Sequence, residues 1–150
     1  MKKLILISVL FIAKTSFAQV IKDVSAGLIS SSVASTNFDN KKKSFEFGQG
    51  ISASFALVTK KTVHNLMYNF GRNSVGMLNG YFLPKNWDVY VVYSYGLGDK
   101  SNYTGVGIEK MEKIGKLKLF EFLELGTGFR GKPIFTVGFL ANLSWSLKKK

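Results

Sequence analysis

Histidine occurs once in this chain of 150 residues, at His64, and cysteine does not occur. These counts exclude a centre with several histidine ligands, a cysteine-ligated zinc site, a thiol nucleophile and a disulfide scaffold. His64 could act as a general base beside a serine or an aspartate, as in membrane acyl hydrolases and acyltransferases. Because no serine lies in a nucleophile-elbow context, we expect an isolated interfacial histidine, no catalytic residues and no enzymatic activity. A membrane lipid acyl hydrolase or acyltransferase is the alternative.

A glycine motif formally matches the dinucleotide-binding fingerprint. Gly126, Gly128 and Gly131 have the required spacing, but that fingerprint needs a strand before it and a helix after it. Here Lys132-Pro133 and another strand-like segment follow. We therefore expect no nucleotide, no other cofactor and no metal.

Four acidic residues alternate with apolar ones and are candidates for a barrel interior: Glu46, Asp88, Glu109 and Glu124. They could form a proton or ion path, or they could pair with cations such as Lys110 and Lys118 in a packed polar core. An eight-stranded barrel has room for little beyond its own side chains. The packed core is therefore favoured.

Alternation of apolar and small or polar residues dominates the chain and predicts strands. The clearest cases are Trp87–Leu97, Ile134–Leu147 and Ser44–Leu57. Weaker segments cover Val20–Ser32, Thr62–Phe70, Val75–Leu83, Tyr103–Met111 and Leu117–Phe129. Short breaks with turn-forming residues separate them. The sequence therefore predicts an all-β, eight-stranded antiparallel up-and-down barrel.

The two faces of these strands predict the surroundings of the barrel. One face is apolar and aromatic, the other is rich in glycine and serine, and most cations lie between strands. A charge-depleted band between charged rims is what a bilayer requires, so the transmembrane type of barrel is favoured over a soluble one. The expected interfacial aromatic girdle is Phe45, Trp87, Tyr95, Tyr103 and Trp145. The expected basic rim, in contact with lipid headgroups, is Lys41, Lys42, Lys43, Lys60, Lys61, Arg130 and Lys132.

In the segment Leu117–Phe129, the sequence does not determine which face of the strand points out of the barrel. If Leu117 and Leu123 face outward, Glu121 does too, whereas the opposite phase turns Lys118 and Glu124 outward. A β-bulge could switch the phase within the strand.

The first 18 residues are predicted to be a cleaved secretory signal peptide. Lys2 and Lys3 precede the apolar run Leu4–Ala13, and the small residues Ser16 and Ala18 precede the cleavage position. The run is shorter than the roughly 20 residues that span a bilayer. Residues 19–150 would then form the barrel domain of an exported protein.

The final strand has only apolar residues on one face: Phe135, Val137, Phe139, Ala141, Leu143, Trp145 and Leu147. With the signal ending Ser-Phe-Ala-Gln and eight amphipathic segments, the chain resembles the small eight-stranded outer-membrane β-barrel proteins of Gram-negative bacteria. Its leader resembles the leaders of Bacteroidota proteins. The resemblance implies an outer-membrane location, with outer-membrane lipid or lipopolysaccharide and the barrel-assembly machinery as partners.

We therefore expect a structural, envelope-integrity or surface-interaction role. We expect no wide pore in the barrel. The alternative is a soluble periplasmic or secreted barrel that binds a small apolar ligand. The net charge of +12 would also suit nucleic acid, but export makes that partner unexpected.

Overall fold

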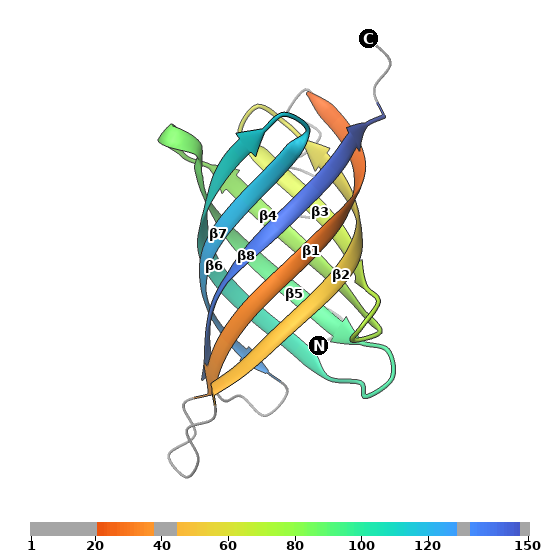
Figure 1. The fold of residues 1–150 in the computed structure, drawn as a ribbon, viewed down its shortest axis with the longest axis vertical. Coiled ribbons are helices and arrows are strands. Elements are labelled where there is room, and N and C mark those ends of the chain that lie inside the picture. Colours follow the sequence, from red (N-terminus) through yellow and green to blue (C-terminus); the bar gives the residue numbers. More distant parts are fainter. Residues whose placement is uncertain (1–20, 38–44, 129–132, 148–150) are drawn as a thin grey trace, which may run out of the picture.

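The computed structural model describes residues 21–37, 45–128 and 133–147. Each strand pairs antiparallel with the next, and the last pairs with the first, so the sheet closes into a barrel (Figure 1). The predicted eight-stranded antiparallel up-and-down barrel is confirmed. Its elements are β1 (Asp23–Asn37), β2 (Phe45–Val58), β3 (Thr62–Asn69), β4 (Ser74–Phe82), η1 (Pro84–Asn86), β5 (Trp87–Gly96), β6 (Asn102–Ile114), β7 (Leu117–Gly128) and β8 (Pro133–Ser146).

The barrel has two ends with different connections. The terminal end, at the top of Figure 1, is where β1 begins and β8 ends, and it carries the short turns 59–61, 83–86 and 115–116. The opposite, loop end carries the described connections 70–73 and 97–101. Among the described residues, no helix has the length and apolarity needed to cross a membrane.

Two strands are longer than their sequence pattern indicates. β1 continues to Asn37 because its residues 33–36 stay in register with β2 on one side and β8 on the other. β6 continues to Ile114 because Gly115 adopts a φ of 63°, which glycine tolerates without steric cost. That conformation closes a two-residue turn, and Ile114 pairs directly with Leu117.

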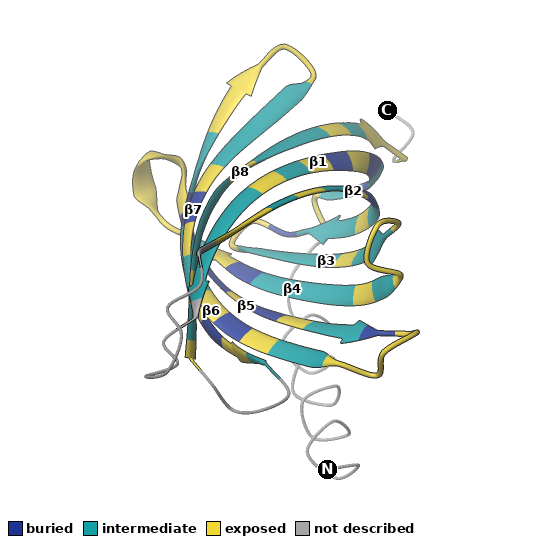
Figure 2. Ribbon diagram, turned by 60° about the horizontal axis from the view of Figure 1, so that its bottom comes forward, coloured by how far each residue is buried: buried dark blue, intermediate teal, exposed yellow. Residues whose placement is uncertain are grey.

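Strand alternation separates an apolar outer wall from a lumen that mixes small, polar and apolar side chains. Buried and exposed positions alternate along β5 (Figure 2). Phe55, Val91 and Phe139, from three different strands, are 43%, 49% and 64% exposed. Ser25, Ser52 and other small residues occupy the inner face. The expectation that the aromatic rows face outward is therefore confirmed.

The register of β7 is continuous with both neighbours, without a bulge. Phe122 is buried and Leu123 exposed, so the leucine face looks outward. Glu121 shares that face and lies opposite Lys110 of β6. Of the two phases left open by the sequence, the structure has the one that places Lys118 and Glu124 inside.

Large rings fill the lumen by lying over glycines. Tyr90, Val92 and Phe122 form the buried cluster, and Tyr103 packs against it. The ring of Tyr103 lies against Gly105 and Gly126, that of Tyr90 against Gly107, and that of Phe122 against Gly138. A side chain at any of these glycines would compete with a ring for the same space.

We predict that Gly126→Ala destabilises the barrel by about 1–3 kcal/mol. The added methyl group would overlap the Tyr103 ring and approach the Thr104 carbonyl oxygen to 2.7 Å, and backbone cannot move away cheaply. The measurement is urea-induced unfolding in detergent micelles. Gly98→Ala is the matched control, because the nearest atom to its methyl group is 4.0 Å away. Equal stability of the two variants would contradict this packing.

Candidate functional site

Two of the predicted lumen acids face each other across a strand pair. Asp88 of β5 is directly opposite Glu109 of β6, and the two residues are only 3% and 5% exposed. Like charges at this spacing repel, so the pair requires a shared proton or a nearby cation. Lys118 lines the same cavity, whereas Lys110, the other suggested partner, lies on the outer wall. The pairing suggested for Lys110 is wrong, because β6 alternates Glu109 inward and Lys110 outward.

The third acid, Glu124, accepts a hydrogen bond from the Tyr103 hydroxyl at 2.5 Å. Tyr103 was expected in the interfacial girdle, and that assignment is wrong. Glu109 of the same strand is buried, strand alternation places Tyr103 on the same inner face as Glu109, and its ring packs against the buried cluster. The tyrosine therefore serves the lumen network instead of the outer wall.

Packed side chains divide the lumen into two cavities. One, at the terminal end, has a volume of about 470 Å³, and the other, at the loop end, about 480 Å³ and includes the fourth acid, Glu46. The residues that line both cavities form the partition between them: Ile29, Met67, Leu78, Glu109 and Leu140. Four of these five are apolar.

The aromatic candidates other than Tyr103 lie toward both ends of the wall. Trp87 and Trp145 lie on the outward rows at the terminal end, and both are exposed. Tyr95 lies on the outward row of β5 near the loop end. Phe45 begins β2, but its side chain lies outside the described residues.

The basic rim is described only in part. Lys60 and Lys61 are exposed in the turn between β2 and β3. The other rim candidates, Lys41, Lys42, Lys43, Arg130 and Lys132, lie outside the described residues.

At the loop end, the backbone N–H and the hydroxyl of Ser101 donate to the Asp99 carboxylate at 3.0 and 2.8 Å. These two donors lower the pKa of Asp99.

Charge on the described outer wall is confined to one cluster. Lys110 forms an ion pair with Glu112 at 3.0 Å, and Glu121 lies opposite Lys110. Lys110 is also opposite Trp87, where β5 begins. The cluster therefore lies toward the terminal end of the barrel, and the middle of the described wall is uncharged.

His64 is on the outer wall with hydrogen-bond partners on its own strand and on the next. Its Nε2 is 3.3 Å from Thr62 Oγ1, and its Nδ1 is 2.8 Å from Asn79 Oδ1. Thr62 precedes His64 by two positions, so strand alternation alone places both on one face. Asn79 was missed because its position opposite His64 depends on the β3–β4 register.

These features define a closed eight-stranded β-barrel with an apolar outer wall and a divided lumen. Comparisons of the chain with protein-family profiles, curated proteins and solved structures find no match.

We predict that Tyr103→Phe lowers the free energy of unfolding by about 1–3 kcal/mol, because Glu124 loses a donor in a half-buried site. Unfolding in detergent micelles measures the loss. Tyr93→Phe is the control, since that ring is on the outward row and exposed. If the two variants lose the same free energy of unfolding, the Tyr103–Glu124 hydrogen bond does not stabilise the barrel.

Proposed function

We propose that the chain is a transmembrane barrel of the outer membrane with a structural, envelope-integrity or surface-interaction role. The observation that carries this proposal is the outer wall. Its exposed residues are large and apolar in the middle of the barrel, while its charged residues lie toward one end. Water solvates such a wall poorly, whereas acyl chains match it.

Strand length supports the same proposal. β5 has ten residues, which at about 3.3 Å each and a tilt near 45° cover roughly 23 Å of bilayer. Trp87 and Tyr95 lie near its two ends, where amphipathic rings favour the membrane–water interface.

The soluble alternative requires the opposite distribution of residues. A soluble barrel that binds an apolar ligand has an apolar interior and a solvated outer wall, as most soluble proteins carry charge across their surface. Here glycine, serine and acidic side chains line much of the loop-end cavity, and large apolar residues are exposed on the outer wall. The wall therefore favours the membrane protein.

We further propose that the terminal end faces the periplasm, because outer-membrane barrels have short periplasmic turns. Export by the signal peptide of residues 1–18 and insertion by the barrel-assembly machinery belong to this proposal. Residues 1–18 lie outside the described part of the chain. Outer-membrane lipid or lipopolysaccharide is the proposed partner of the wall and rims.

The divided lumen argues for a role other than transport. A mostly apolar partition separates the two cavities, formed by Ile29, Met67, Leu78, Leu140 and the acidic Glu109. Eight-stranded barrels also lack the width of porins. The surface and the wall, not a pore, are the parts that could act on the envelope.

Fractionation of cells that express the full chain is the direct test of location. We expect the protein in the outer-membrane fraction and a heat-modifiable mobility in gels, because a closed barrel resists unfolding by detergent until heated. Recovery from the soluble periplasmic fraction without detergent would reject the membrane proposal in favour of the soluble barrel.

We also predict that Val91→Arg costs about 2–4 kcal/mol in lipid vesicles, because the charge would enter the middle of the bilayer. Thr127→Arg, near the loop end of β7, is the matched control and should cost about 0–1 kcal/mol. On a soluble barrel both exposed positions would tolerate arginine within about 0.5 kcal/mol. Unfolding in vesicles distinguishes the two cases.

A further inference from the structure

We propose that the cavity at the terminal end of the lumen binds a short apolar peptide, with the peptide's ammonium group at the Asp88–Glu109 pair and its carboxylate at lysines around the opening. The ligand class is a peptide of two or three residues with both termini free. The cavity has a volume of about 470 Å³, which is within the range of small-molecule sites. The inference goes beyond the proposed function, because the cavity belongs to the closed barrel and does not depend on the surrounding membrane.

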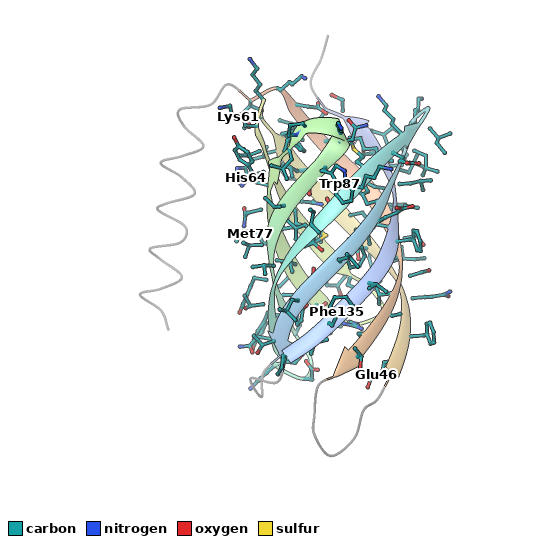
Figure 3. The ribbon with its side chains drawn as sticks, turned by 90° about the vertical axis from the view of Figure 1, so that its left-hand side faces the viewer. Glu46, Lys61, His64, Met77, Trp87 and Phe135 are labelled. Carbon is teal, nitrogen blue, oxygen red and sulfur yellow. The ribbon has the colours of Figure 1, made fainter. Side chains whose placement is uncertain are left out.

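The acidic pair lies at the floor of this cavity. Glu109 belongs to the partition between the two cavities, and Asp88 is directly opposite it on the neighbouring strand. Figure 3 shows Trp87, which lines the terminal-end cavity, toward the top of the barrel and Glu46, which lines the other cavity, at the bottom. The side chains of Asp88 and Glu109 share a hydrogen bond, so one carboxyl group carries a proton. The pair then keeps one negative charge, which matches a single ammonium group.

Buried acceptor atoms without donors line the same cavity. The Oδ1 atoms of Asn65, Asp88 and Asn142 are buried, and none has a hydrogen-bond partner among the described residues. All three residues line the terminal-end cavity, and Asp88 is only 3% exposed. Because a buried acceptor without a donor is unfavourable, the cavity favours a ligand that brings several N–H donors. An ammonium group brings three.

Four lysines line the cavity nearer its opening at the rim. Lys22, Lys60 and Lys85 are exposed there, and Lys118 is half-buried. None of the four forms an ion pair with a described carboxylate. Their ammonium groups repel a divalent cation or a polyamine, and they attract the carboxylate of a ligand whose positive end is at the floor. The two sets of charges together match a zwitterion and not a simple cation.

The spacing between the two charged regions determines the length of the ligand. Lys85 precedes Asp88 by three positions, which span at most about 10 Å at roughly 3.3 Å per residue. A single amino acid carries both charges on one Cα and is too short to reach both regions, whereas an extended peptide of two or three residues spans roughly 7–10 Å. Apolar side chains on the peptide match the apolar residues that line much of the cavity. These residues include Val63, Met67, Met111, Phe120 and Leu140.

The test is isothermal titration calorimetry at pH 7 with the full chain in dodecyl maltoside micelles, and protein-free micelles are the blank. The probes are leucyl-leucine, N-acetyl-leucyl-leucine, which lacks the ammonium group, leucyl-leucine amide, which lacks the carboxylate, and free leucine. We expect leucyl-leucine to bind at least about tenfold more tightly than the acetylated probe and than free leucine. We expect the amide to bind at least about threefold more weakly than leucyl-leucine, because the lysines are more exposed than the acids.

Asp88→Asn removes the charge at the floor and keeps the size of the side chain. We expect this variant to bind leucyl-leucine at least about tenfold more weakly than the wild-type protein. Glu46→Gln is the matched control with unchanged affinity, because Glu46 lines the other cavity. Heat-modifiable mobility verifies that each variant has closed. Should Asp88→Asn fail to close, the comparison of leucyl-leucine with its acetylated form on the wild-type protein decides instead.

The proposal is overturned if leucyl-leucine gives no heat of binding above the blank, if the acetylated probe binds equally well, or if closed Asp88→Asn keeps wild-type affinity. A titration with calcium chloride tests the metal alternative, and Ca²⁺ binding that is tighter than peptide binding and is lost in Asp88→Asn also overturns the proposal. Because the assay uses micelles, a protein that binds no peptide but fractionates with the outer membrane rejects only this site.

Discussion

The hydrogen-bonded pairing of β8 with β1 is the interaction on which the rest of the structure depends. It runs from Ser25 opposite Ser146 to Asn37 opposite Ile134, and it leaves the sheet without an open edge. A closed ladder satisfies its backbone groups internally, so no water is needed at the wall. Only under that condition can an outer surface be as apolar as this one and still belong to a stable chain.

Closure also determines what the lumen can contain. Eight strands enclose a narrow space, and large rings fit there only where the neighbouring strand offers glycine, as Tyr103 does over Gly105 and Gly126. The β5–β6 register places Asp88 opposite Glu109, and Tyr103 donates to Glu124 within the same lumen. The narrow lumen and the partition between the cavities are therefore consequences of barrel size. They leave the outer wall and its rims, and not a transport path, as the surfaces for contact with other molecules.

The outer wall is apolar over most of its described surface but carries a short row of polar side chains. At most described positions it presents only hydrocarbon, but near the terminal end it presents a hydroxyl, an imidazole and an amide in one hydrogen-bonded row. Polar groups that face lipid are costly, and here each finds a partner within the row. Lys60 and Lys61 are exposed in the turn just before Thr62, so this part of the wall is more polar than its middle.

By itself, the sequence determined the fold class, the number of strands and the outward direction of Phe55, Val91 and Phe139, because alternation is a local property that survives in any paired strand. It placed Glu46, Asp88 and Glu109 on the inner face for the same reason, but it left the direction of Glu124 open. Alternation with the inward Glu109 already turns Tyr103 inward and Lys110 outward, so those two corrections needed no tertiary information. Tertiary structure decided which face of β7 points outward, and with it the directions of Glu121 and Glu124, and the meeting of His64 with Asn79. These depend on where each strand begins and on its register with the next, and both are set by closure around the whole barrel, not by any short stretch of residues.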